Sequence, residues 1–192
     1  SMAEVRAMLD AVIAVEGQAD VVQISGGEPT LHPHFFEVLA EARARPIRHL
    51  MLNTNGLRLA QEPGFAEQLA RAVDGGRAFE VYLQFDSLAR DPLLALRGAD
   101  LRRVREQALQ RLEALGLSTT LVMTVRRGLN DHEVGDVIRY GTRWSCVRGV
   151  TLQPVQDAGR NDGYDARMHR LTVSELRRRI VEQSGVFTPD DI

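Results

Sequence analysis

Lysine is absent from this chain of 192 residues, and cysteine occurs only once, at Cys146. A single cysteine excludes a disulfide within the chain and a metal site made of its cysteines alone. The apolar runs are too short to cross a membrane, and charged residues near the N-terminus argue against a signal peptide. The formal net charge of -2 favours neither nucleic-acid nor membrane binding, so we expect a cytoplasmic globular protein that is not transmembrane.

Helical and extended sequence patterns alternate along the chain. Short runs rich in Val, Leu, Ile and Thr predict strands near residues 21–25, 50–53, 80–85, 119–125 and 150–153, with amphipathic stretches between them. Strict alternation of this kind indicates a parallel sheet with right-handed crossovers. We expect a single domain over residues 1–192, built either as an open α/β sheet or as a partial barrel.

The segments that follow the strands are where ligands bind in parallel α/β folds. Residues 25–30, with the sequence Ser-Gly-Gly-Glu-Pro-Thr, follow the first predicted strand. Gly26 and Gly27 let a ligand approach the backbone closely, and Glu28 offers a carboxylate that can hold an ammonium group. We therefore expect a ligand site at this strand end.

This string resembles the Gly-Gly-Glu-Pro motif of radical S-adenosylmethionine (SAM) enzymes, in which the same strand end holds the amino group of SAM. The resemblance implies that Gly26, Gly27 and Glu28, together with Pro29, bind the methionine part of SAM. It also implies a (β/α) TIM-like barrel of parallel strands.

Later strand ends resemble the family in the same order. Thr54 and Asn55 belong to a Thr-Asn-Gly string and are expected to face the SAM pocket. Gln84 stands where many family members have a serine that contacts SAM, and Asp86 follows it as either a pocket residue or a turn cap. Arg97 is a further candidate for holding a ligand carboxylate.

The last two predicted strands also end in candidate residues. Arg126 follows the fourth strand, and Gln153 ends the fifth, near which adenine lies in the family. Arg160 is a further candidate contact for SAM or substrate. Asn130 or Asp131 is expected to cap the next helix.

The cysteine motif that defines the family, Cys-x3-Cys-x2-Cys, does not occur in this sequence. Such cysteines ligate a 4Fe-4S cluster, whereas Cys146 lies far from the expected loop and is expected to be a small buried side chain. We expect the cluster cysteines upstream of Ser1, so that this chain is a partial barrel in which the first strand and cluster loop are missing. On that expectation the chain alone is inactive.

The resemblance implies an enzyme whose intact form cleaves SAM reductively to a 5′-deoxyadenosyl radical, which abstracts hydrogen from an unactivated C–H bond. The motifs look closest to the tetraether-lipid-synthase and molybdenum-cofactor-biosynthesis subgroups, so a small-molecule or lipid-like substrate is expected. Other expected partners are an electron donor such as flavodoxin or ferredoxin and a second copy bound through an exposed sheet edge. No nucleic acid is expected.

Two alternatives stay open at this point. One is a cluster-free barrel that binds SAM or a nucleotide without catalysis, and the other is a molybdenum-cofactor-type nucleotide cyclase. An aldolase-like barrel is disfavoured because the chain has no lysine for a Schiff base.

Overall fold

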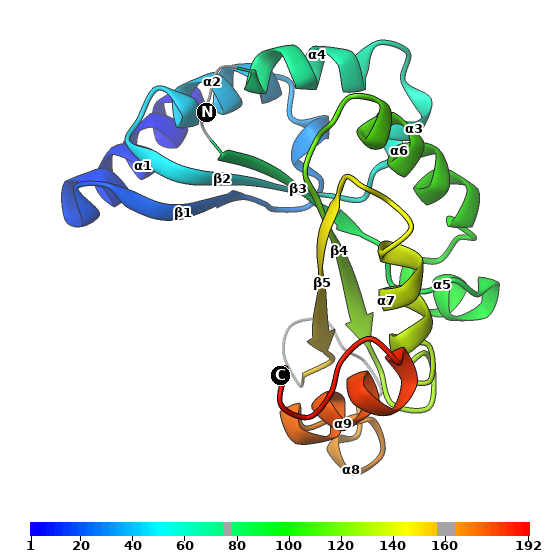
Figure 1. The fold of residues 1–192 in the computed structure, drawn as a ribbon. Helices are drawn as coiled ribbons and strands as arrows, with labels where there is room; N and C mark the ends of the chain where they lie inside the picture. Colours follow the sequence, from blue (N-terminus) through cyan, green and yellow to red (C-terminus); the bar gives the residue numbers. More distant parts are fainter. Residues whose placement is uncertain (75–77, 157–163) are drawn as a thin grey trace.

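The computed structural model describes residues 1–74, 78–156 and 164–192 (Figure 1). Its centre is one sheet in which each strand pairs in parallel with the next along the chain, in the order β1-β2-β3-β4-β5. The strands are β1 Ala19–Ile24, β2 Ile47–Thr54, β3 Ala78–Gln84, β4 Thr119–Val125 and β5 Val147–Pro154. This confirms the predicted parallel α/β architecture.

Helices precede, connect and follow the strands, and the connecting ones lie along the outer side of the strongly twisted sheet (Figure 1). They are α1 Met2–Glu16, η1 Pro29–Leu31, α2 Phe35–Arg43, α3 Leu57–Gln61, α4 Phe65–Val73, α5 Arg90–Arg97, α6 Arg102–Ala114, α7 Val134–Gly141, α8 Ala166–His169 and α9 Val173–Ser184. Among the residues described, no helix combines the length and the apolar character needed to cross a membrane.

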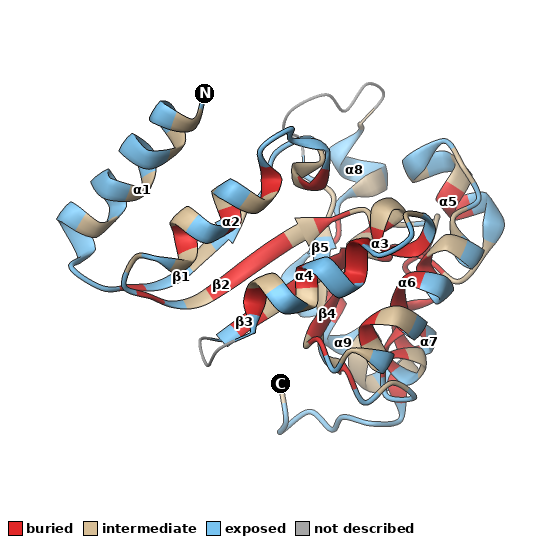
Figure 2. Ribbon diagram, turned by 90° about the horizontal axis from the view of Figure 1, so that it is seen from above, coloured by how far each residue is buried: buried red, intermediate tan, exposed pale blue. Residues whose placement is uncertain are grey.

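The hydrophobic core lies between the sheet and these helices. Leu52, Val81 and Leu83 point toward the helices and are fully buried. Figure 2 shows buried residues along the strands and on the inward sides of α2, α4 and α6, whereas α1 has none. Because side chains alternate along a strand, Glu80 and Tyr82 point to the opposite side of the sheet. We call that opposite side of β1–β5 the concave face.

β1 and β5 are the edge strands of the described sheet. Val21 of β1 is 57% exposed. Unpaired edges of this kind are available to another strand. Dimerisation through an edge stays a prediction.

Glu113 of α6 fixes the loop that leads into β5. Its carboxylate accepts hydrogen bonds from the Ser145 backbone N at 3.0 Å, the Ser145 Oγ at 2.8 Å and the Cys146 backbone N at 2.6 Å. These bonds lower the pKa of Glu113 from 4.5 to about 2, and the bond from the Ser145 side chain has the largest effect. The ionised carboxylate therefore stabilises the folded state.

We expect the substitution Glu113→Gln to lower the melting temperature near neutral pH and to matter progressively less in acid. Since the pKa of Glu113 is lower in the folded state, its stabilising contribution is complete above pH 4.5 and is lost as the pH falls toward about 2. Thermal unfolding followed by circular dichroism across this pH range checks the prediction. A gap between the two melting temperatures that does not change with pH would contradict it.

Candidate functional site

The carboxyl ends of the five parallel strands lie together at one end of the sheet, which we call the strand-end rim. It consists of residues 25–30, 54–57, 84–87, 124–131 and 153–156. All the predicted SAM-binding residues within the described chain lie on this rim. Arg160 falls outside the described residues.

Glu28 joins the loop after β1 to the end of β2. Its Oε1 accepts hydrogen bonds from the Thr30 backbone N at 3.2 Å, the Thr30 Oγ1 at 2.7 Å and the Thr54 Oγ1 at 2.7 Å. Its Oε2 accepts one from the Asn55 backbone N at 2.7 Å. The structure therefore brings the two motifs predicted to bind SAM into direct contact. Because a carboxylate oxygen has two lone pairs, Oε2 retains one acceptor position.

Gly26 and Gly27 leave the backbone uncovered beside Glu28. Both are exposed, and a Cβ built on either would meet no atom within 4 Å. Gly26 has a φ of 145°, a conformation that disfavours any other residue. Pro29 begins the short helix η1, whose first turn is capped by the Glu28 side chain. The open backbone gives a ligand room to approach this strand end.

Asp86 joins the ends of β3 and β4 in the same manner. It is fully buried, and its φ of 62° is unusual for a residue other than glycine. Arg97 donates to both carboxylate oxygens, at 2.8 and 2.9 Å, and the Thr124 backbone N donates to Oδ1 at 3.1 Å. Burial raises the pKa of Asp86, but the bonds from Arg97 and the charges of Arg97 and Arg105 outweigh burial, so the pKa is lowered. A direct contact between Asp86 and SAM stays a prediction.

Arg105 of α6 completes this cluster and was missed by the sequence analysis. Its Nη2 donates to Asp86 at 2.9 Å, and its Nε donates to the Gln84 backbone oxygen at 2.5 Å. The residue is 1% exposed, and burial lowers its pKa to about 10, which leaves it charged at neutral pH. Its position on the buried stripe of α6, three residues before Ala108 and four before Leu109, was the available signal.

Asn130 has a larger role than the predicted helix cap. Its Nδ2 donates to the backbone oxygens of Asp86 at 2.9 Å and Thr124 at 2.7 Å, and its Oδ1 accepts from the Arg126 backbone N at 2.8 Å. The following helix begins at Val134, so the predicted cap at Asn130 or Asp131 was wrong. Asn130 instead locks the loop after β4 onto the end of β3.

Arg126 and Gln153 lie on the far part of the rim. The Nη2 of Arg126 is 3.2 Å from the Nε2 of His169 in α8, so its side chain extends toward that helix. Gln153 is exposed and is the register partner of Thr124 in β4. The side chain of Gln84 is half-buried. For Arg126, Gln153 and Gln84, a contact with SAM stays a prediction.

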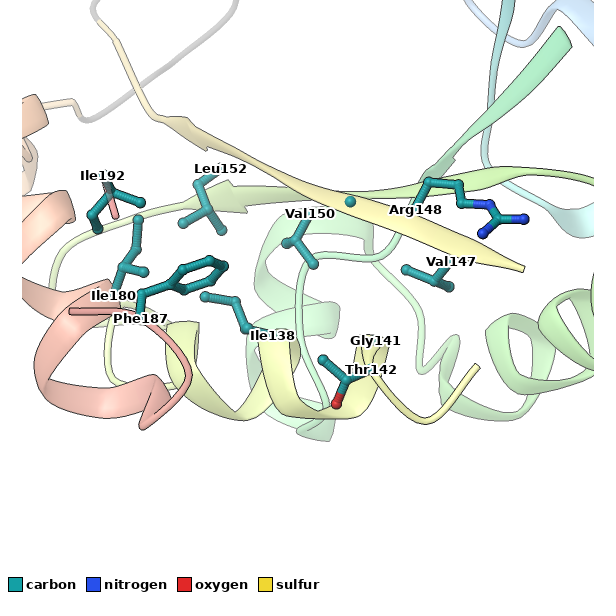
Figure 3. Close-up of a pocket in the computed structure, with 11 residues that line it drawn as sticks. Ile138, Gly141, Thr142, Val147, Arg148, Val150, Leu152, Ile180, Phe187 and Ile192 are labelled. Atoms are coloured by element: carbon teal, nitrogen blue, oxygen red, sulfur yellow. The ribbon is translucent and has the colours of Figure 1, made fainter. Parts of the chain in front are cut away.

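A separate apolar pocket lies on the outer side of β5, away from the rim (Figure 3). Its volume is about 290 Å³, and α7, α9 and the C-terminal segment line it together with Val150 and Leu152. No predicted site residue takes part in it. The pocket therefore belongs to the packing of the C-terminal region.

Cys146 does not fit an iron–sulfur cluster. It precedes the first residue of β5 and thus lies at the end of the sheet opposite the rim. It is buried, and burial together with Glu113 raises the pKa of its thiol to about 12, which disfavours the thiolate that iron requires. Within the described residues, no group of three or more His, Cys, Asp or Glu side chains is arranged to hold a metal ion.

The model of the radical SAM superfamily matches residues 1–141. The chain is 34% identical over 173 residues to 7,8-dihydro-6-hydroxymethylpterin dimethyltransferase of Methanocaldococcus jannaschii, covering 88% of this chain and 33% of that protein. It is 32% identical over 152 residues to GTP 3′,8-cyclase of Stenotrophomonas maltophilia, covering 77% of this chain and 43% of that protein. Among solved structures, anSMEcpe with bound AdoMet and a peptide aligns with a TM-score of 0.64 at 17% identity, covering 93% of this chain and 49% of that chain.

This chain belongs to the radical SAM superfamily. The family resemblance, the partial-barrel fold and the assignment to an enzyme family are thereby confirmed. The cofactors of that family are SAM and a 4Fe-4S cluster. The rim fits SAM, because it combines open backbone at two glycines with an available Glu28 acceptor. The single cysteine of this chain does not fit the cluster, which requires several thiolate ligands.

Proposed function

We propose that this chain is the SAM-binding core of a radical SAM enzyme that acts on a polar, nitrogen-rich ring of the pterin or guanine type. The observation that carries the proposal is the junction at Glu28, which unites the glycine string after β1 with the end of β2 beside open backbone. SAM, when bound, would supply the carbon radical used by this family.

The residues of this chain bind and orient SAM in the proposed function. The backbone at Gly26 and Gly27 and the free acceptor position of Glu28 receive the ammonium group of the methionine part. Arg97, whose guanidinium is partly exposed, supplies positive charge for the carboxylate group of SAM. The buried bonds at Asp86 and Asn130 hold the remaining strand ends in place, so little conformational freedom is lost on binding.

The substrate class is supported by the relatives and by the polarity of the concave face. The names of the two relatives give a dihydropterin and GTP as substrates. Hydrogen-bonding side chains such as Tyr82, Thr120 and Thr151 lie on the concave face, which suits a polar ring better than a lipid chain. We therefore favour a polar ring over the lipid-like substrate. A reductase of the flavodoxin or ferredoxin type and a cytoplasmic location stay predictions.

Isothermal titration calorimetry of the full chain with SAM tests the proposal. We expect Gly27→Val to weaken SAM binding at least about tenfold, because its side chain would fill the open space beside Glu28. The melting temperature is expected to stay within about 2 °C of the parent chain, since a Cβ at Gly27 meets no neighbour within 4 Å. Absence of SAM binding to the parent chain, or unchanged binding to the variant, would count against the proposed site.

A further inference from the structure

One carboxylate occupies the concave face of the described strands. The five strands contain two carboxylate side chains, Asp20 and Glu80. Asp20 lies on the same face of β1 as Val22 and Ile24, which pack against the core. Glu80 alternates with the fully buried Val81 and therefore points to the concave face, where its side chain is 13% exposed.

Glu80 is held in place from both neighbouring strands. Its Oε2 lies 3.0 Å from the Nε2 of His49 in β2, and its Oε1 accepts a hydrogen bond from the Oγ1 of Thr120 in β4. Each carboxylate oxygen has two lone pairs, so one acceptor position remains on each oxygen. Two partners that fix the carboxylate while leaving one acceptor on each oxygen are what a preorganised ligand contact requires.

We propose that Glu80 binds the 2-amino-4-oxopyrimidine edge of the substrate ring, an inference that rests on the proposed function. In this edge a ring N–H and the neighbouring amino N–H point the same way, so a carboxylate accepts both as two parallel charge-assisted hydrogen bonds. Pterins and guanine share the edge. The imidazole of His49, 32% exposed beside the carboxylate, extends the polar surface available to the ring.

The position of Glu80 along β3 suits an anchor remote from the reacting carbon. Gln84 at the rim lies four positions after Glu80 in β3, which corresponds to about 13 Å of strand. A ring held at Glu80 therefore directs the rest of its substrate along the concave face toward the SAM site. Binding energy from such a remote group positions the reacting C–H bond.

Fluorescence and calorimetric titrations of the full chain test this assignment with four probes, in the presence of SAM. They are 6-hydroxymethylpterin, its 2-oxo counterpart 6-hydroxymethyllumazine, guanosine and inosine, which lacks the 2-amino group. We expect the 2-amino member of at least one pair to bind about tenfold or more tightly than its partner, since one of the two charge-assisted bonds is lost without the amino group. The pair that shows the preference identifies the source of the edge as pterin or guanine.

The substitution Glu80→Gln is expected to abolish this preference while leaving the affinity for SAM unchanged. Glu106→Gln, at an exposed position on α6, is the matched control and should retain the preference. If Glu80→Gln fails to fold, Glu80→Asp, which keeps the charge but withdraws the carboxylate by one methylene, takes its place and is expected to reduce the preference. Equal binding within both pairs, or a preference that survives in Glu80→Gln, would overturn the assignment.

The two proposals fail separately in this experiment. SAM binding without discrimination between the probes defeats the assignment of Glu80 and leaves the proposed SAM-binding function standing. Discrimination between the probes without SAM binding defeats the proposed function and leaves Glu80 as a ring-binding residue.

Discussion

Replacing Asp86 by asparagine is expected to lower the free energy of unfolding by about 3–5 kcal/mol, because it removes one partner from a buried ion cluster. Asp86 has no exposed surface and is the carboxylate shared by Arg97 and Arg105. Arg105 is itself buried, and its Nη1 has no hydrogen-bond partner among the described residues. Without the aspartate charge, two guanidinium groups remain close together, and asparagine offers them one acceptor oxygen in place of two.

Urea unfolding at neutral pH, followed by circular dichroism, measures this effect. Asp91→Asn on α5 is the matched control, because Asp91 is 88% exposed, and we expect it to change stability by less than about 0.5 kcal/mol. Equal midpoints for the two variants would show that the cluster does not stabilise the fold.

The same cluster predicts a dependence on pH. Since the folded-state pKa of Asp86 lies below its ordinary value of 3.8, the ionised group stabilises the fold above that pH. Its contribution is lost as the pH falls below 3.8, and Asp86→Asn should lack this part of the acid sensitivity. Parallel loss of stability in the parent and the variant below that pH would contradict the assignment.

The order of the elements followed from local patterns in the sequence, and so did the prediction of a ligand site at residues 25–30. The Gly-Gly-Glu-Pro string is contiguous, so its residues are neighbours in any fold. Strand limits were predicted less well: β2 begins at Ile47 and not near residue 50, and β5 begins at Val147 and not near residue 150. His49 and Gly149 interrupt the apolar runs because they occupy the concave face, where apolar side chains are not required.

The buried polar contacts of the rim could not be predicted from the sequence. Arg105 reaches Asp86 across 19 residues, and Asn130 reaches the Asp86 backbone across 44 residues. An arginine on a helix is ordinarily a surface residue, and an asparagine before a helix is ordinarily a cap. Their roles depend on how α6 and the loop after β4 pack against the strand ends, which periodicity does not specify.

The substitution Glu28→Gln is expected to weaken SAM binding about 100-fold, the largest effect on ligand binding that we predict. The loss of negative charge removes the charge-assisted bond to the ammonium group, about 1.5–3 kcal/mol. In the parent chain, Oε1 of Glu28 accepts from Thr30 and Thr54, and Oε2 accepts from the Asn55 backbone. The amide nitrogen of the introduced glutamine would therefore face a hydrogen-bond donor. One of these donors would lose its acceptor, which weakens the junction between the loop after β1 and the end of β2.

Calorimetry with SAM and thermal unfolding distinguish the two consequences of Glu28→Gln. Thr54→Val removes one bond to Glu28 but keeps its charge, so we expect a similar loss of stability with a smaller loss of SAM affinity, about tenfold or less. Glu37→Gln, at an exposed position on α2, is the control for charge and should change neither quantity. If Glu28→Gln and Thr54→Val weaken SAM binding equally, Glu28 acts only by holding the strand ends together. A much larger loss in Glu28→Gln shows that its carboxylate receives the ammonium group directly, because Thr54→Val also weakens the junction, including the bond that Thr54 accepts from the Gly56 backbone N at 3.2 Å, but keeps the charge of Glu28.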